Sequence, residues 1–256
     1  MVTPGGLLLD IDGTLYVGEE PVPGAPEAVH ALARRGVPIR YLTNTTRFSR
    51  RELAGRLRAM GFPAGDGELF TAPVAAAAWL AAEGIRRIAL YVPQSTLEDF
   101  AAFELVEGDP EAVVVGDLGE GWTFRRMNQA FRQLLGGARL VALQRNRFWR
   151  TPDGLTLDAG AFVAALEYGA DVEALVVGKP SGEFFRLAAA SLPQAGAPPL
   201  VVGDDIETDI AGARAAGLPA ALVRTGKFRE ESLAAAPVPP DLVLRSIAEL
   251  VDLFEE

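Results

Sequence analysis

The stretch Leu7-Leu8-Leu9-Asp10-Ile11-Asp12-Gly13-Thr14 decides how the rest of the chain is interpreted. Its apolar beginning shows no alternation of polar and apolar residues, which is typical of a strand buried on both faces of a parallel sheet. Residues two apart in an extended chain leave it on the same face, so Asp10 and Asp12 form a pair of carboxylates. Gly13 then allows a sharp turn close to a ligand. The first strand is therefore expected to end in two acidic side chains.

Expected strands and helices alternate in the N-terminal and C-terminal parts of the chain, before residue 85 and after residue 171. Pro stands at the start of the first expected helix and Gly follows its end, which is the usual asymmetry of helix termini. Strand, helix, strand, helix in this order indicates right-handed βαβ units and a parallel sheet. The expected elements are strands at 7–11, 39–42, 175–177, 200–202 and 220–223, and helices at 26–35, 49–60, 181–190, 209–216 and 246–254.

The middle of the chain predicts a separate α/β unit. Apolar runs at 88–92, 113–115 and 140–142 indicate strands, and 98–102 and 123–135 indicate helices. The predicted fold class is therefore α/β, with a Rossmann-like parallel-sheet core that carries helices on both faces. This core is expected to consist of residues 1–84 and 172–256, with a smaller α/β domain inserted at 85–171.

Polar groups follow four of the expected core strands. Ligands of open parallel sheets bind in the crevice beyond the carboxyl ends of the strands, so these groups are expected to converge on one site. The four groups are Asp10 to Thr14, Thr43 with Asn44, Gly178 with Lys179 and Pro180, and Gly203 with Asp204, Asp205 and Asp209.

The residue types in these groups suit phosphoryl transfer. Close carboxylates repel one another and persist most easily around a cation, and oxygen ligands with room for water suit Mg²⁺. The Thr43 hydroxyl and the Asn44 backbone N–H can bind phosphate oxygens, and Lys179 supplies positive charge. Enzymes of phosphoryl transfer mainly position groups and neutralise charge, which is what this set can do.

Each group has a simpler interpretation when it is taken alone. Asp10-x-Asp12-Gly13 could begin a calcium loop, but Pro21 stands at the twelfth position, where such a loop needs glutamate. Gly-Lys-Pro alone is a turn, and Gly203-Asp204-Asp205 alone could be a helix start with capping acids. The combination, in this order and at strand ends, favours the phosphoryl-transfer site.

Composition excludes several other classes. The net charge of −10 argues against a nucleic-acid partner, and the absence of cysteine excludes thiolate nucleophiles and zinc–thiolate sites. The one histidine, His30, lies in a helical stretch and is expected on its surface. The start of the chain lacks a secretory pattern and no apolar stretch reaches spanning length, so a cytoplasmic protein without a membrane partner is expected.

At these motifs the sequence resembles the haloacid dehalogenase-like (HAD) hydrolase superfamily. Asp10-x-Asp12-Gly13-Thr14 is similar to its first motif, Thr43 to its second, Lys179 to its third, and Gly203-Asp204-Asp205 with Asp209 to its fourth. The inserted unit resembles the type-two cap of the NagD-like branch. Within this branch, four further segments resemble one subgroup, and this resemblance favours pyrophosphate or N-phosphorylated compounds as substrates. These segments are residues 42–46, 128–132, 162–168 and 177–180.

The resemblance implies a role for each matching residue. Asp10 would be the nucleophile, and Asp12 would protonate the leaving group and later activate water. Mg²⁺ would be bound by the side chains of Asp10 and Asp204 and by the backbone carbonyl of Asp12. The remaining implied roles are phosphate binding by Thr43, Asn44 and Lys179, support by Asp205, Asp209 and Gly13, and substrate contacts by Arg47 and Gly160.

Three other functions stay open. A phosphotransferase or mutase of the same superfamily would pass the phosphoryl group to another acceptor. A non-enzymatic phosphate-binding regulatory module would need none of the catalytic carboxylates. A dinucleotide-binding protein is disfavoured, because no Gly-x-Gly-x-x-Gly follows the first strand. The expected partner is a small phosphorylated substrate, and the resemblance also implies a homodimer through the cap.

Overall fold

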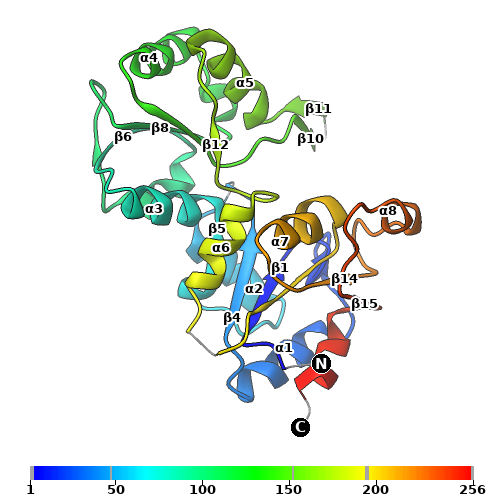
Figure 1. The fold of residues 1–256 in the computed structure, drawn as a ribbon. Helices are drawn as coiled ribbons and strands as arrows, with labels where there is room; N and C mark the ends of the chain where they lie inside the picture. Colours follow the sequence, from blue (N-terminus) through cyan, green and yellow to red (C-terminus); the bar gives the residue numbers. More distant parts are fainter. Residues whose placement is uncertain (1–2, 47, 152, 194–195, 255–256) are drawn as a thin grey trace. The chain divides into compact units, whose positions relative to one another are not determined.

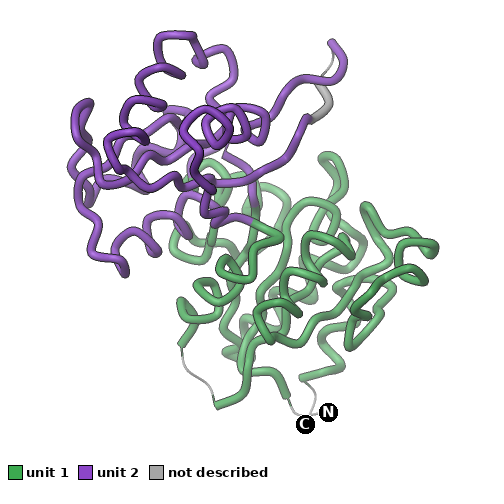
Figure 2. The backbone as a smooth tube through the Cα atoms, turned by 45° about the horizontal axis from the view of Figure 1, so that its top comes forward, with its two compact units in different colours: residues 1–43, 50–71, 179–256 green, residues 44–49, 72–178 purple. Residues whose placement is uncertain are grey.

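The chain divides into two compact units (Figure 2). The first contains residues 1–43, 50–71 and 179–256, and the second contains residues 44–49 and 72–178. The structure is a computed structural model that describes residues 3–46, 48–151, 153–193 and 196–254, without the side chains of 149–151. The boundaries differ from the expected ones, because residues 44–49, 72–84 and 172–178 group with the inserted part rather than with the core.

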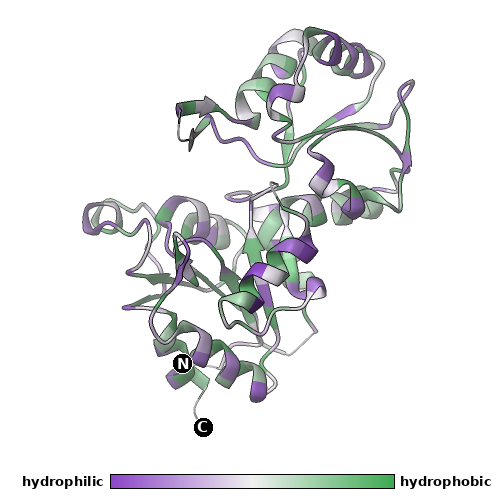
Figure 3. Ribbon diagram, turned by 180° about the vertical axis from the view of Figure 1, so that it is seen from behind, coloured by the Kyte–Doolittle hydropathy of each residue, from purple (hydrophilic) through white to green (hydrophobic). Residues whose placement is uncertain are grey.

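A six-stranded parallel sheet forms the centre of the first unit (Figure 1). Its strand order is β15-β14-β13-β1-β4-β5. The three leucines at the start of β1 are fully buried, and Figure 3 shows the strands of this sheet coloured mainly as hydrophobic. Each fully buried leucine contributes about 1.5–3 kcal/mol relative to an exposed one. The strands are β1 (Leu7–Asp10), β4 (Ile39–Thr43), β5 (Leu69–Thr71), β13 (Leu200–Gly203), β14 (Ala220–Val223) and β15 (Leu242–Leu244).

The strand order reverses between the neighbouring strands β1 and β13. From β1 the chain proceeds to β4 and β5 on one side, and from β13 it proceeds to β14 and β15 on the other. The point where the strand order reverses is the topological switch point, where open α/β sheets bind ligands. Leu9 pairs with Val202 and Asp10 pairs with Leu42, so the ends of β1, β4 and β13 lie side by side.

Helices cover both faces of this sheet, as right-handed crossovers in opposite directions require. Helix α1 packs against the 3₁₀ helix Ile247–Phe254, and α6 packs against α7. Ser181 begins α6 because its hydroxyl accepts a hydrogen bond from the backbone N–H of Glu183. The helices are α1 (Ala25–Arg34), α2 (Arg50–Ala59), α6 (Gly182–Ala190), α7 (Ala211–Ala215) and α8 (Glu230–Ala234), with a short hairpin of β2 (Tyr16–Val17) and β3 (Glu20–Pro21) after β1.

The second unit has its own five-stranded parallel sheet, with the order β12-β9-β8-β6-β7. Its core includes Tyr91, whose ring stacks on Trp122 with centroids 5.4 Å apart, and Trp122 stacks in turn on Phe162 with centroids 5.1 Å apart. The strands are β6 (Arg87–Tyr91), β7 (Glu104–Leu105), β8 (Ala112–Val115), β9 (Arg139–Ala142) and β12 (Leu175–Val176), with an antiparallel hairpin of β10 (Phe148–Thr151) and β11 (Gly154–Leu157). The helices are α3 (Ala72–Ala82), α4 (Phe124–Leu135) and α5 (Ala159–Ala170).

One expected core strand belongs to the other sheet. The run at 175–177 forms β12, but Leu175 pairs with Val141 and Val176 pairs with Ala142 in the second unit. The prediction that this run is a core strand is therefore wrong. A short apolar run shows that a strand is buried but not which sheet it joins.

Several other expected helices differ from the observed ones in helix type or in their first residue. The segment expected as a helix at 98–102 is a 3₁₀ helix at Gln94–Phe100, and the last helix is a 3₁₀ helix at Ile247–Phe254. The helix expected at 209–216 begins earlier, with a π-helical turn at Ile206–Ile210 that leads into α7.

Among the described residues, no helix has both the length and the apolar character that crossing a membrane requires.

Candidate active site

Asp10 ends β1 and is buried at the switch point of the sheet. Its Oδ1 accepts a hydrogen bond from the Lys179 ammonium group, and its Oδ2 accepts one from the Thr14 hydroxyl over 3.2 Å. Burial raises the pKa of Asp10, and the charge of Lys179 opposes this rise. A hydrogen bond to each oxygen thus fixes the orientation of the Asp10 carboxylate, and a nearby cation is needed to keep this carboxylate ionised.

Lys179 reaches this position from the turn before α6 rather than from the end of a core strand. Its buried Nζ donates to Asp10 and, over 2.7 Å, to Asp209 Oδ1. Burial alone would lower the pKa of Lys179, but these two carboxylates raise it above its usual value. Lysine suits this place because a compact ammonium group can donate to both acids at once.

The loop after β13 supplies the other carboxylates. Asp205 caps the π-helical turn, because its Oδ1 accepts from the backbone N–H groups of Glu207 and Thr208 over 3.0 and 3.1 Å. Asp209 is buried, and its Oδ2 accepts from the Asp205 N–H over 3.2 Å. Gly203 is required here, since a Cβ on it would lie 2.4 Å from the Asp209 side chain.

Three carboxylates converge into one cluster. Oxygens of Asp10, Asp204 and Asp209 all lie within 4.8 Å of one another, and all three side chains are buried. Burial raises the pKa of Asp204 to about 6 and that of Asp209 to about 7. Three carboxylates, which offer only oxygen ligands, suit a hard cation such as Mg²⁺. The positive charge of the cation would offset the repulsion between the carboxylates. The donor set therefore fits a divalent metal.

Asp12 differs from the buried acids because its side chain is exposed. The peptide between Asp12 and Gly13 is fixed, since the Gly13 N–H donates to the Tyr16 carbonyl over 2.8 Å. In a trans peptide the C=O points opposite to the N–H, so the Asp12 carbonyl points away from Tyr16. Gly13 has φ of +91°, and a Cβ on it would lie 2.0 Å from Asp204 Oδ2.

The remaining predicted residues are placed as follows. Thr43 is buried at the end of β4, one residue after Leu42, which pairs with Asp10. Asn44 begins the segment 44–49 of the second unit, and Arg47 lies outside the described residues. Gly160 lies in the first turn of α5, in the second unit, where its N–H donates to the Asn146 carbonyl over 3.0 Å. The structure therefore brings together Asp10, Gly13, Lys179, Asp204, Asp205 and Asp209.

A fifth strand end, Thr225-Gly226-Lys227 after β14, also contributes to the site and was not predicted from the sequence. The Thr225 hydroxyl donates to the Gly13 carbonyl over 2.6 Å, and the Lys227 N–H donates to Asp204 Oδ2 over 2.6 Å. The Lys227 ammonium group lies 3.1 Å from Asp205 Oδ2. The available signal was that polar residues follow β14 directly, and that one of the chain's few lysines is among them.

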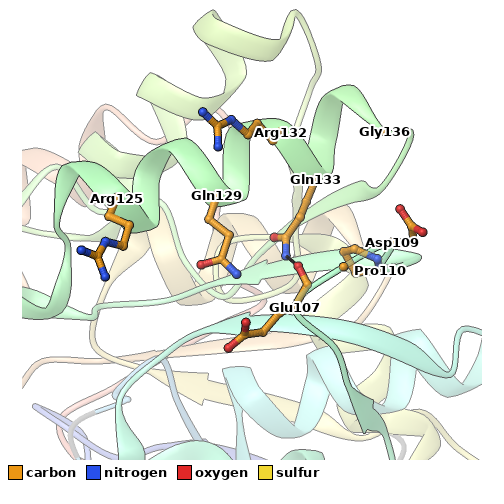
Figure 4. A pocket seen from close by; sticks show the side chains of 9 residues that line it. Glu107, Asp109, Pro110, Arg125, Gln129, Arg132, Gln133 and Gly136 are labelled. Carbon is orange, nitrogen blue, oxygen red and sulfur yellow. Dashed lines mark hydrogen bonds between the residues drawn. The ribbon is translucent and has the colours of Figure 1, made fainter.

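A cavity of about 450 Å³ lies in the second unit, between α4 and the turn that joins β7 to β8 (Figure 4). The amide of Gln133 is held by the Tyr91 hydroxyl, over 2.9 Å, and donates to the Glu107 carbonyl over 2.7 Å. The charged side chains that line it, Glu107, Asp109, Arg125 and Arg132, are all exposed and balance in sign. This lining is that of a solvated surface, and we assign it no chemistry.

The fold and the site define an α/β enzyme with a buried, oxygen-only carboxylate cluster and a lysine at the switch point of its sheet. A family profile described as haloacid dehalogenase-like hydrolase matches residues 7–105, and a HAD-hydrolase-like profile matches residues 176–250. The chain belongs to the haloacid dehalogenase-like hydrolase family, and it is a hydrolase of the phosphatase type.

Similar proteins cover nearly the whole chain. Haloacid dehalogenase-like hydrolase domain-containing protein 2 of Homo sapiens is 39% identical over 246 residues, which are 96% of this chain and 94% of that protein. Phospholysine phosphohistidine inorganic pyrophosphate phosphatase of Rattus norvegicus is 39% identical over 255 residues, 97% and 93% of the two chains.

Solved structures show the same fold. The p-nitrophenyl phosphatase from Archaeoglobus fulgidus matches with a TM-score of 0.86 and 31% identity, covering 97% of this chain and 98% of that one. NagD from E. coli K-12 matches with a TM-score of 0.88 and 27% identity, covering 97% and 98%. The predicted fold class and the predicted NagD-like branch are thereby confirmed.

Proposed function

We propose that this chain is a Mg²⁺-dependent phosphatase that forms an aspartyl-phosphate on Asp10 and hydrolyses it with water. The observation that carries the proposal is the Lys179 ammonium group between Asp10 and Asp209, inside a cluster of buried carboxylates. A carboxylate that is oriented on both oxygens and paired with a cation is suited to act as a nucleophile.

The reaction has two steps. A carboxylate oxygen of Asp10 attacks phosphorus, the bond from phosphorus to the leaving oxygen breaks, and Asp12 gives its proton to that oxygen. Water then attacks phosphorus, Asp12 takes its proton, and the bond to Asp10 breaks to release inorganic phosphate. The exposed position of Asp12 supports this role, since it must meet both the leaving group and water.

The metal would be held by the side chains of Asp10 and Asp204 and by the backbone carbonyl of Asp12. Asp205 and Asp209 would support these ligands, and Gly13 would allow their close approach. When bound, Mg²⁺ supplies positive charge that offsets the negative charge of the phosphoryl oxygens.

Thr43, Asn44 and Lys179 would bind the transferred phosphoryl group. Thr43 lies at the strand end next to Asp10, and Lys179 contacts Asp10 directly. Substrate contacts by Arg47 and Gly160 stay predictions from the resemblance. For Gly160 the structure offers another reason for glycine, because a Cβ there would lie 2.5 Å from the Asn146 carbonyl oxygen.

The names of the relatives guide the choice of substrate. One relative is named a phosphatase of phospholysine, phosphohistidine and inorganic pyrophosphate, and one structural neighbour is named a p-nitrophenyl phosphatase. We propose a small phosphorylated substrate, with pyrophosphate and N-phosphorylated compounds as the first to be tested. The cytoplasmic location and the homodimer through the cap stay predictions.

The test is phosphate release from p-nitrophenyl phosphate by metal-free protein, with and without added Mg²⁺. We expect turnover only with the metal, and a loss of at least about 10³-fold in kcat for Asp10→Asn. Asp66→Asn is the matched control, because Asp66 is an exposed acid of the same unit that lies 3.7 Å from Arg58. Turnover by folded Asp10→Asn would contradict the aspartyl-phosphate, and metal-independent turnover would contradict the role of Mg²⁺.

A further inference from the structure

The segment Thr225-Gly226-Lys227, at the end of β14, touches both acidic loops of the site. The Thr225 hydroxyl donates to the Gly13 carbonyl over 2.6 Å. The next two residues contact Asp204, which is 2% exposed and belongs to the loop after β13. This tripeptide at the end of β14 thus contacts the loops that follow two other strands, β1 and β13.

The Asp204 carboxylate is enclosed by two glycines. A Cβ on Gly226, where φ is +56°, would lie 2.0 Å from Asp204 Oδ2 and 2.6 Å from the Gly13 Cα. A Cβ on Gly13 would lie 2.0 Å from the same oxygen. No side chain fits on either residue without moving Asp204, so both positions require glycine.

The two oxygens of Asp204 have different surroundings. Oδ2 accepts the hydrogen bond from the Lys227 N–H over 2.6 Å. Within the part of the chain that the structure describes, no hydrogen bond reaches Oδ1. The Lys227 N–H and the two glycines thus fix the position of Asp204 Oδ2, and Oδ1 stays available to the carboxylate cluster.

We infer that Thr225 and Gly226 are positioning residues that fix Asp204 and the Gly13 loop in the geometry that binds the divalent metal. This inference rests on the proposed function, because it concerns the same Mg²⁺ site. Thr225 and Gly226 do not touch the reacting atoms. Thr225 acts through the Gly13 peptide, and Gly226 acts through the Asp204 carboxylate.

The test measures the dissociation constant of Mg²⁺ by calorimetry on metal-free protein without substrate. Thr225→Val keeps the shape of the side chain and removes one hydrogen bond, so Mg²⁺ should bind about fivefold more weakly. Thr225→Ser restores the hydroxyl and should bind Mg²⁺ like the wild type. Gly226→Ala should weaken binding at least tenfold (about 1.4 kcal/mol), because Asp204 must move.

Thr96→Val is the matched control. Thr96 is a buried threonine of the second unit, and its hydroxyl donates to the Pro93 carbonyl over 2.9 Å, so the same type of bond is lost outside the segment Thr225-Gly226-Lys227. Turnover supplies a second readout. Thr225→Val should raise the Mg²⁺ concentration needed for half-maximal rate by a larger factor than it lowers kcat at saturating Mg²⁺.

The outcomes separate this inference from the proposed function. If the wild type binds Mg²⁺ and Thr225→Val binds it as tightly, the positioning role is wrong and the phosphatase proposal stands. If Thr225→Val and Thr96→Val weaken binding equally, the effect is general destabilisation, and the inference is also wrong. If the wild type binds no divalent ion, the metal site itself fails, and the inference fails with it.

Discussion

Lys179 Nζ lies 2.7 Å from Asp209 Oδ1, and both side chains are buried. The same ammonium group also donates to Asp10, so one lysine balances two carboxylates that would otherwise repel each other. A buried charge that loses its partner is strongly destabilising, whereas an exposed pair contributes little. The lysine is therefore expected to stabilise the fold as well as the ionised form of Asp10.

Replacing Lys179 by methionine should destabilise the metal-free protein by about 3–5 kcal/mol, because Asp10 and Asp209 lose their shared cation. Saturating Mg²⁺ should recover part of this loss, since a bound cation restores positive charge to the cluster. Urea unfolding with EDTA and with Mg²⁺ measures both effects.

Arg186→Met is the control for this variant. Arg186 pairs with Glu183 over 2.7 Å on the surface of α6, so its loss should cost less than about 1 kcal/mol and should not respond to Mg²⁺. Equal losses in the two variants would show that the buried ion pair has no special role in stability.

Replacing Asp12 by asparagine should lower kcat by about 10²–10⁴-fold, because the leaving group and the water lose their proton carrier. Stability should stay close to that of the wild type, because the Asp12 side chain is exposed and asparagine has the same shape. Steady-state kinetics and thermal unfolding measure the two quantities.

A leaving group that needs no proton provides the control for Asp12. With p-nitrophenyl phosphate, only the hydrolysis of the aspartyl-phosphate should be slowed, whereas an alkyl phosphate should be slowed in both steps. An equal loss with the two substrates would argue against Asp12 as the acid of the first step.

The sequence predicted the strands that position the acids, because their residues are apolar throughout. Leu7–Leu9 and Val201–Val202 are fully buried, so nothing in their pattern competes with a central parallel strand. The carboxyl ends of these strands could then be placed at one edge from topology alone. Asp10 and Asp204, which end up in one cluster, followed from that step.

The position of Lys179 was predicted for the wrong reason. The run before it is apolar, but it pairs with β9 of the second unit. Lys179 is placed instead by the turn that Ser181 caps at the start of α6. Sheet membership depends on pairing partners that are distant in sequence, and the pattern of one strand does not encode them.

The residue types after β14 could indicate that Thr225, Gly226 and Lys227 lie near the site, but not which contacts they make. Two of the contacts depend on backbone groups, namely the Gly13 carbonyl and the Lys227 N–H, and every sequence contains these. Asp209 differs in this respect, because its place after the strand at 200–202 already predicted that it would join the site, and one of its oxygens lies within 4.8 Å of oxygens of Asp10 and Asp204.

Metal-free protein should lose stability as the pH rises from about 5 to 8, because burial raises the pKa of Asp204 to about 6 and that of Asp209 to about 7. The folded state keeps protons that the unfolded chain has released, since an unperturbed aspartate has a pKa of about 3.9. The free energy of unfolding therefore falls with pH in this window.

Mg²⁺ should reverse this trend, because metal binding requires the ionised carboxylates and strengthens as they lose their protons. Urea unfolding at several pH values, with EDTA and with Mg²⁺, gives the two slopes. Asp204→Asn is the control, since it removes one of the two groups and should reduce the slope in EDTA. A stability in EDTA that rises from pH 5 to 8 would contradict the assignment.

Gly160 and Gly169 lie in the same helix, α5, and allow two explanations of Gly160 to be separated. A Cβ on Gly160 would lie 2.5 Å from the Asn146 carbonyl oxygen and 2.6 Å from that of Arg145, so Gly160→Ala should destabilise by about 1–3 kcal/mol. A Cβ on Gly169 would be 3.5 Å from the Phe131 ring, an ordinary contact, so Gly169→Ala should stabilise by about 0.4–1 kcal/mol.

Thermal unfolding of the two alanine variants, together with KM for p-nitrophenyl phosphate, decides between packing and substrate contact. If Gly160 is needed for packing, Gly160→Ala unfolds at a lower temperature than Gly169→Ala, because backbone carbonyls cannot yield as a flexible side chain can. If Gly160 is needed for substrate contact alone, the two variants unfold alike and only Gly160→Ala raises KM. The close approach to Asn146 favours the first result, since a substrate contact would not require glycine to face a carbonyl of its own chain.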